Sequence, residues 1–267
     1  MGAPRRVFRD LRRCARGAAL ALGSLAGVAL ALAVPSAQVS AQSIVAAEYV
    51  DPTSEYPHGV LGDSVEWKTL EIVVEPAPGN GGSDAGRVRH TMAAGDGLVF
   101  EDTAPRLWDM TGDGVPEVVV VQSHQNRGAR LLIIGLDGAK PSVIAATPHI
   151  GTRFRWLAPV GAGDLDGDGH VEVGFVDRPH LAKTLRVWRL EDEAFYEVAV
   201  LPGVSNHRIG EDFITGGIRD CGSGPELLTA DARWREIVAT RLEGGDLSAK
   251  AIGAFSQDAV AAAMACR

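Results

Sequence analysis

The chain has few positive charges outside its first 16 residues. Its 267 residues include 26 Lys and Arg against 34 Asp and Glu, a formal net charge of −8. Six arginines but only one acid, Asp10, lie in residues 1–16, so the remainder holds 20 basic against 33 acidic side chains and carries −13. Surfaces that bind phosphate groups need clustered Lys and Arg. The charge therefore excludes a nucleic-acid binder and a protein that lies on an anionic membrane surface.

The sequence also lacks the common catalytic signatures. It contains no Gly-x-Ser-x-Gly, His-Glu-x-x-His, phosphate loop or dinucleotide fingerprint, and no two of its seven histidines stand at metal-binding spacing. Aromatic residues make up only 6%, whereas 32 glycines indicate many tight turns. With 46% apolar residues the chain has enough to bury a core. These features favour a folded, turn-rich protein without a recognisable catalytic motif.

Residues 1–41 are predicted to be a secretory signal peptide. The arginine-rich start is followed by an uncharged run over residues 17–34, then by Pro35 and small residues. We expect cleavage after Ala41, with a site after Ala37 as the alternative. An uncleaved anchor is a second reading, since 18 apolar residues just reach the length of a membrane span. We expect a Sec-type signal, because the twin-arginine match at Arg5 and Arg6 is weak. The mature chain is then periplasmic or secreted, without a membrane span.

Export changes the interpretation of the cysteines. Of the three, Cys14 leaves with the signal, so Cys221 and Cys266 remain in an oxidising compartment. The even count predicts a disulfide between them, which chain entropy would make worth about 3–4 kcal/mol. Two unpaired thiols are the alternative. A zinc site is not expected, because there is no Cys-x-x-Cys and no histidine at ligand spacing.

A motif occurs twice, 55 residues apart. Residues 109–117 read DMTGDGVPE and residues 164–172 read DLDGDGHVE, and each leads into an apolar run. A third copy at residues 219–226, RDCGSGPE, keeps the Gly-x-Gly turn but has lost the acids. Self-similarity at a fixed period is the sign of a repeat protein.

Short strand-like stretches follow each copy of the motif. They are β-branched and separated by turn residues, as in antiparallel sheets, and lie at residues 118–121, 129–136, 142–146, 173–176, 184–190, 196–201, 236–242 and 248–252. Two more, at 65–75 and 87–92, precede the first copy and flank a low-complexity loop at 76–86. The pattern predicts an all-β domain over residues 42–255, a small β-propeller of about four blades with four strands each. A helix is expected only at 256–264, capped by Ser256, within a C-terminal segment 256–267.

The acidic loops predict calcium sites. In the second loop, carboxylates at alternate positions and a backbone carbonyl converge on one point, which suits a hard cation of calcium size better than magnesium. Its expected ligands are Asp164, Asp166, Asp168, the His170 carbonyl and Glu172. The first loop has one charge fewer and is expected to bind more weakly, through Asp109, Thr111, Asp113, the Val115 carbonyl and Glu117. The alternative for both loops is turn chemistry without metal.

At these residues the chain resembles a known family. An Asp-rich, Gly-punctuated loop that ends in Glu before an apolar strand, repeated at 50–60 residues in an exported chain, looks like the FG-GAP and VCBS repeats, related to the propeller blades of integrin α-chains. The resemblance covers about residues 95–245. It implies a bacterial exported β-propeller whose calcium loops are structural, and in many members it implies binding of a ligand or partner. The chain departs from the family pattern in three ways. It has no clear Phe-Gly element, its third copy lacks the acids, and its first unit has no motif.

Basic and aromatic residues predict a candidate ligand face. Propeller loops converge on one face around the central channel. The residues expected there are Arg153, Arg155, Trp156, Arg178, His180, Lys183, His207 and Arg208. Solvated charges and salt bridges are the alternative.

Two function classes remain open. The first is a calcium-stabilised, non-catalytic binding or scaffold module of the cell envelope. Its expected partner is a glycan, a peptide or an anionic small molecule, and it is expected to be a monomer. The second is a secreted hydrolase or lyase with a channel site built from His180, His207, Glu211 or Asp212. If those side chains lie within hydrogen-bond reach of one another, the enzyme is favoured; if they are dispersed, the binding module is favoured.

Overall fold

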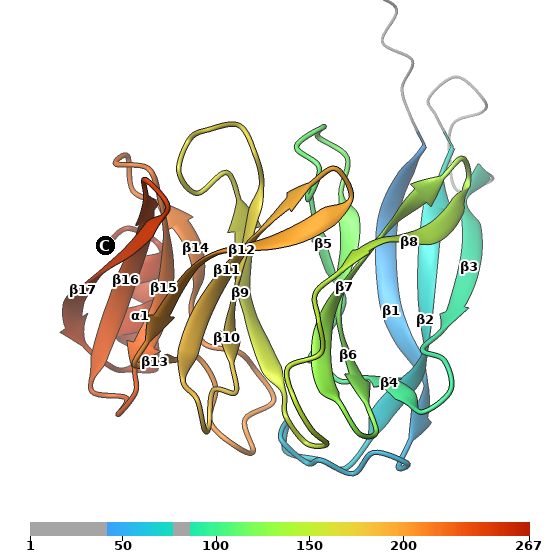
Figure 1. Ribbon diagram of the computed structural model, residues 1–267, viewed down its shortest axis with the longest axis horizontal. Helices are drawn as coiled ribbons and strands as arrows, with labels where there is room; N and C mark the ends of the chain where they lie inside the picture. Colours follow the sequence, from blue (N-terminus) through green and yellow to red (C-terminus); the bar gives the residue numbers. More distant parts are fainter. Residues whose placement is uncertain (1–41, 77–85) are drawn as a thin grey trace, which may run out of the picture. The chain divides into compact units, whose positions relative to one another are not determined.

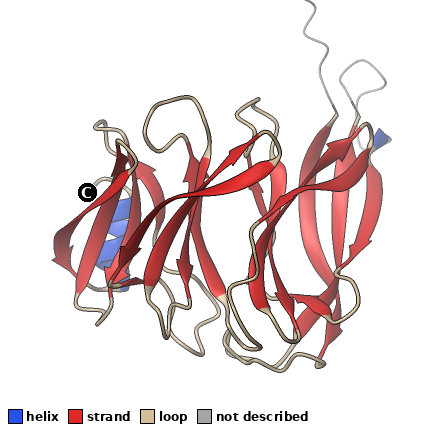
Figure 2. Ribbon diagram, viewed as in Figure 1, coloured by secondary structure: helices blue, strands red, loops and turns tan. Residues whose placement is uncertain are grey.

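The computed structural model describes residues 42–76 and 86–267, which form strands and one short helix (Figures 1 and 2). The predicted signal peptide and most of the low-complexity loop lie outside these residues. No helix within the described ranges is long and apolar enough to cross a membrane. The elements are β1 (Ser43–Thr53), β2 (Glu66–Glu75), β3 (Val88–Ala93), β4 (Leu98–Phe100), β5 (Arg106–Trp108), β6 (Glu117–His124), β7 (Gly128–Asp137), β8 (Lys140–Ala146), β9 (Leu157–Gly163), β10 (Glu172–Asp177), β11 (Thr184–Glu191), β12 (Ala194–Pro202), β13 (Val204–Ser205), β14 (Gly217–Asp220), β15 (Pro225–Asp231), β16 (Glu236–Glu243), β17 (Asp246–Ala254) and α1 (Gln257–Met264).

The strands form three antiparallel sheets in chain order. The first has eight strands, β1-β2-β4-β6-β7-β8 with β3 on β2 and β5 on β6. The second is β12-β11-β10-β9, and the third is β13-β15-β16-β17 with β14 on β15. The all-β prediction is confirmed. The prediction of four separate four-stranded blades is not, because β4 joins β2 to β6 and merges the first two expected units into one sheet.

A four-strand meander nevertheless recurs three times. It appears as β5 to β8, β9 to β12 and β14 to β17, with neighbouring strands paired in sequence. In each meander the Gly-rich loop joins the first strand to the second. The repeat seen in the sequence is therefore a structural unit, whose motif marks the same connection each time.

The hydrophobic core lies between successive units. In β6, Val118 and Val120 pack with Leu70 and Leu132, whereas Val119 and Val121 belong to a second cluster with residues of β9 and β10 such as Phe175. Both faces of β6 are therefore covered, which explains why this strand is a continuous run of valine instead of an alternating pattern. A third cluster, including Val187, Leu227 and Val238, fills the space between the second and third sheets.

The helix α1 covers the outer face of the last sheet. Val260 and Ala263 pack on Leu228 and Ile237, side chains that point away from the second sheet. Ser256 caps the helix as predicted, since its hydroxyl accepts a hydrogen bond from the Ala259 N–H. This short helix gives a terminal repeat the cover that a further sheet would otherwise provide.

The predicted cysteine pair lies at the end of this helix. The sulfurs of Cys221 and Cys266 are 2.10 Å apart, a disulfide distance, and their Cα atoms are 5.6 Å apart. Such a link would tie the C-terminal segment to the loop between β14 and β15.

Candidate functional site

The two acidic loops share one hydrogen-bond pattern. The first aspartate of each loop accepts backbone N–H bonds from the two glycines, Asp109 from Gly112 and Gly114, and Asp164 from Gly167 and Gly169. All four glycines have positive φ, between 77° and 91°, which side chains other than glycine rarely adopt. The shared conformation of the loop backbone therefore accounts for the position of the glycines after the first aspartate.

The closing glutamate anchors the loop to its own start. Glu117 accepts the Met110 N–H at 2.7 Å, and Glu172 accepts the Leu165 N–H at 2.9 Å. Both side chains are buried, and burial raises the pKa of each carboxyl. In each loop, one oxygen of the closing glutamate is therefore engaged by the backbone.

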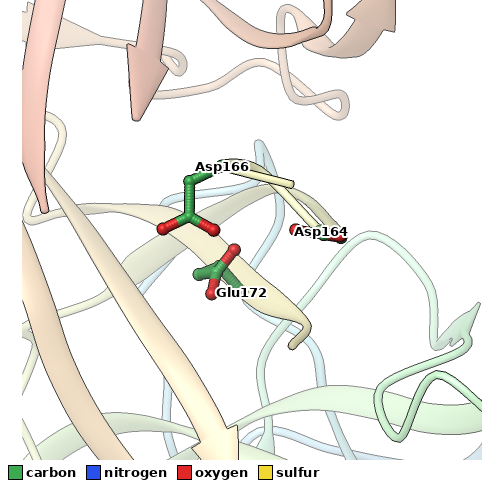
Figure 3. A group of neighbouring side chains, drawn as sticks. All are labelled: Asp164, Asp166 and Glu172. Carbon is green, nitrogen blue, oxygen red and sulfur yellow. The ribbon is translucent and has the colours of Figure 1, made fainter. Parts of the chain in front are cut away.

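In the second loop the carboxylates are close together. Asp164, Asp166 and Glu172 each offer an oxygen within 4.8 Å of the others, and Figure 3 shows Asp166 and Glu172 turned toward one another. Arg189 of β11 binds this cluster. Its guanidinium lies 2.6 Å from Glu172, 3.0 Å from Asp166 and 2.7 Å from Asp168. The donor set suits calcium in kind, but an internal cation already contacts three of its carboxylates.

The first loop contains no such arginine. The pairing of β6 with β7 brings Gly135 opposite Glu117, and a Cβ built on Gly135 would lie 3.6 Å from Glu117 Cγ. Within the described ranges, the carboxylates of Asp109, Asp113 and Glu117 make no ion pair. Asp113 and Glu117 border a cavity of about 500 Å³ whose wall also includes Thr111, His170 and the acidic turn at Glu191, Asp192 and Glu193. Oxygen donors without a neighbouring cation fit a hard metal ion.

The third loop is held by arginines. Arg219 donates to Glu226 at 2.7 Å, and Arg241 lies 3.3 Å from the same carboxylate. Asp220, one residue beyond the aligned start, accepts the N–H bonds of Gly222 and Gly224. The turn therefore survives here with Asp220 as its acceptor and Glu226 as its closing acid, whereas Cys221 and Ser223 replace the other acids of the second loop.

A second feature lies at the opposite ends of the same strands. β9 runs from Leu157 to the acidic loop and β10 returns to Asp177, so the loops at the other ends of these strands are about 20 Å from the acidic loop. There the β1–β2, β8–β9, β10–β11 and β13–β14 connections surround a pocket of about 310 Å³. It is lined by His58, Phe154, Arg155, Trp156, Arg178, Pro179, His180, Leu181 and Ile209.

Two hydrogen-bonded histidines form part of this pocket. His207 Nε2 lies 2.8 Å from the Glu211 carbonyl and must donate to it, so its Nδ1 is an acceptor in the neutral ring. His180 Nε2 lies 2.9 Å from that Nδ1 and donates, which leaves His180 Nδ1 as a further acceptor. Burial lowers the pKa of His180 to about 4, aided by the charges of His207 and His58, and burial also lowers the pKa of His207. Both rings are therefore neutral at pH 7.

A third histidine enters the pocket from the β1–β2 loop. His58 Nδ1 contacts Glu101, a fully buried carboxylate that also accepts the Ser123 hydroxyl. Burial raises the pKa of Glu101, and the bonds to His58 oppose that effect. The ring of His58 stacks on Phe154 with centroids 4.9 Å apart. Glu101 and Phe154 therefore fix the orientation of this ring.

Positive charge lines the pocket. Among the described residues that line it, the arginines are Arg155 and Arg178. Arg178 uses Nε and Nη2 to bind Asp177, so Nη1 is not engaged in that pair. Phe154, Arg178 and Lys183 have φ values of 59°, 48° and 49°, in the left-handed region that such residues rarely occupy. Backbone strain of this kind gathers at functional sites.

The predicted ligand face is only partly brought together. Arg155, Trp156, Arg178 and His180 line the pocket, and His207 supports it from behind. Arg153 stacks instead on Tyr56 and Phe154, Lys183 donates to the Ala232 carbonyl, and Arg208 lies over Trp234 and Phe255. His58, Phe154, Leu181 and Ile209 were not predicted. No motif marks them, since the first two come from irregular loops and the exposed apolar pair has no periodic pattern.

The residues named for a hydrolase or lyase converge only in part. His180 and His207 are in hydrogen-bond contact, but His207 meets the backbone carbonyl of Glu211, whose carboxylate accepts the Arg208 N–H. Asp212 is exposed and makes no side-chain hydrogen bond in the described part of the chain. A carboxylate does not complete this histidine pair.

Together, the fold and the recurring loops define an all-β repeat protein with an acidic loop at one end of its strands and a pocket at the other. Residues 109–175, from the first acidic loop through the second, match the FG-GAP-like repeat family. The resemblance inferred from the motif is confirmed over this segment. No curated protein matches the chain.

Proposed function

We propose that this protein is an exported, non-catalytic binding module with a propeller-like arrangement of repeats, and that its ligand binds in the pocket around Trp156 and His180. The convergence of four loops on this pocket carries the proposal. Loops held by a rigid scaffold are where binding residues concentrate. The arginine-rich start of the chain supports export to the periplasm or the outside of the cell.

The pocket chemistry favours an acidic sugar. Arg155 and Arg178 offer donors to a carboxylate, and no acidic side chain lines the pocket. His180 Nδ1, left as an acceptor, suits a hydroxyl group. Leu181 and Ile209, which are 64% and 71% exposed, offer apolar contact to a ring face. A hydroxylated carboxylate such as a uronic acid satisfies all three features.

Galacturonate is expected to raise the melting temperature, whereas galactose, which lacks the carboxylate, is not. A ligand at 100 times its Kd adds about 2.7 kcal/mol to stability by mass action. Arg155→Gln and His180→Gln are each expected to weaken binding at least about tenfold, since each removes one polar contact. Lys250→Gln, on exposed β17, is the control and should bind as the unaltered protein does. Equal responses to galacturonate and galactose would contradict the proposed ligand class, and unchanged affinity in both pocket variants would contradict the site.

We also propose that calcium stabilises the first repeat. Asp109, Asp113 and Glu117, with Thr111 and the Val115 carbonyl, would hold the ion at the β5–β6 connection. The metal there would be structural, because the loop and the pocket lie at opposite ends of the strands. Bound calcium would neutralise carboxylates that no basic side chain offsets.

Chelation is expected to lower the melting temperature, and millimolar calcium to restore it. At 100 times Kd the stabilisation is about 2.7 kcal/mol, or roughly 5–10 °C for a domain of this size. Asp113→Asn should abolish this calcium response, while Asp137→Asn in the β7–β8 turn should retain it. Thermal melts at matched ionic strength measure both. A calcium response that survives Asp113→Asn at full size would show that the ion binds elsewhere.

A further inference from the structure

The position opposite the closing glutamate differs among the three repeats. Strand register brings Arg189 opposite Glu172 in the second repeat. In the third, Leu227 pairs with Thr240, so the next position along places Arg241 beside Glu226, 3.3 Å away. In the first repeat Val118 pairs with Ile134, so the same position holds Gly135, which lies against Glu117. The residue comes from the third strand of each meander, so it is set by the pairing of two regular strands and not by the conformation of a loop.

Arg189 is built into the second loop as a cation. Its side chain extends from β11 to the loop and is only 19% exposed. Its three guanidinium nitrogens, Nε, Nη1 and Nη2, lie within 3.0 Å of Glu172, Asp168 and Asp166 respectively. Glu172 is itself fully buried and is held by the Leu165 N–H. Because a guanidinium presents donors in a planar fork, one arginine joins all three carboxylates.

Arginine and calcium would compete for the same oxygens. Calcium needs six to eight oxygen ligands at about 2.3–2.6 Å. Of the four side-chain carboxylates in the second loop, Asp164 accepts three backbone N–H bonds and the other three contact Arg189. A divalent ion at this point would meet a positive charge at contact distance. The close approach of Asp166 and Glu172 therefore fits an arginine-centred cluster, while backbone N–H groups hold Asp164 beside them.

We propose that Arg189 takes the place of calcium in the second repeat, so that the loop richest in acids folds without metal. Arg241, with Arg219, has the same role in the third repeat. Calcium dependence is then confined to the first repeat, the one with Gly135 at this position. This assignment reverses the order of affinity expected from the number of acids in each loop, and its first-repeat clause rests on the calcium proposal above.

Arg189→Gln tests the replacement directly by calcium titration calorimetry on the full chain. The variant is expected to bind one more calcium ion than the unaltered protein and to gain a melting temperature that falls by several degrees on chelation. Arg186→Gln, three residues earlier on the same strand and paired with Asp177 and Glu197, is the matched control and should gain no site. Arg189→Lys keeps the positive charge and should also gain none. A folded Arg189→Gln that binds no additional calcium would overturn the proposal.

Asp166→Asn in the otherwise unaltered chain supplies a second measurement that does not depend on how Arg189→Gln folds. Calcium stoichiometry is expected to stay the same, because the second loop does not bind the ion. Loss of one bound calcium would overturn the proposal. If the unaltered chain bound no calcium while Arg189→Gln bound one ion, the first-repeat calcium proposal would fail and the role of Arg189 would stand.

Discussion

Replacing both cysteines, Cys221→Ser with Cys266→Ser, is expected to lower the free energy of unfolding by about 3–4 kcal/mol, because a link between residues 45 apart restricts the unfolded chain. For a domain of this size the melting temperature should fall by roughly 10 °C. The loss is expected to begin at α1, since the C-terminal segment would then be held to the last sheet mainly by Val260 and Ala263. Denaturant unfolding followed by circular dichroism measures the change.

The unaltered protein under reducing conditions is the control. Its stability should fall to that of the double serine variant, and the variant itself should not respond to the reductant. Alkylation followed by mass measurement should label neither cysteine before reduction. Two thiols that label freely in the folded, unreduced protein would show that the link does not form.

Trp156→Ala is expected to destabilise the fold by about 3–5 kcal/mol, as is usual when a large buried side chain is truncated. Trp156 is 2% exposed and packs in the cluster between the first and second sheets. Its indole N–H donates to the Glu101 carbonyl at 2.7 Å, and its ring stacks on His180 and meets the edge of His207. The substitution should therefore also abolish galacturonate binding. Denaturant unfolding and calorimetry measure the two effects.

Two variants separate packing from hydrogen bonding. Trp156→Phe keeps most of the apolar volume but leaves the Glu101 carbonyl without its donor, so a loss of about 1–2 kcal/mol is expected. Trp234→Ala removes a half-buried ring that contacts Phe255 and Arg208, and should cost less than Trp156→Ala because less of the ring is buried. Equal losses for Trp156→Ala and Trp234→Ala would contradict the assignment of Trp156 to the core of the pocket.

Local patterns predicted most of the strands and the helix. The apolar runs at 65–75, 129–136 and 184–190 became β2, β7 and β11 with ends shifted by one residue. β4, β5 and β13 were missed because strands of two or three residues carry no period. The longer strands β1, β9 and β14 were also not predicted. The merging of two units into one sheet was also beyond local reasoning, since it depends on the single pair that β4 makes with Trp67.

The acidic loops were also recognisable from local spacing. Their relative affinity for a metal ion was not, because it depends on a residue from another strand. Spacing within residues 164–172 identifies the donors, whereas Arg189 lies 17 residues beyond Glu172 and meets it only through the register of β10 with β11. The pocket was likewise not predictable from local sequence patterns. His58 and His180 are far apart in sequence and share a cavity only because loops from different units converge.

Nuclear magnetic resonance of the indole N–H and histidine ring signals would show whether the pocket at Trp156 and His180 binds an acidic sugar. During titration with galacturonate, the signals of Trp156 and His180 are expected to shift and saturate together with an affinity that Arg155→Gln weakens, while the signal of Trp234 stays in place. Signals of Trp156 and His180 that remain unmoved at saturating galacturonate would contradict the account.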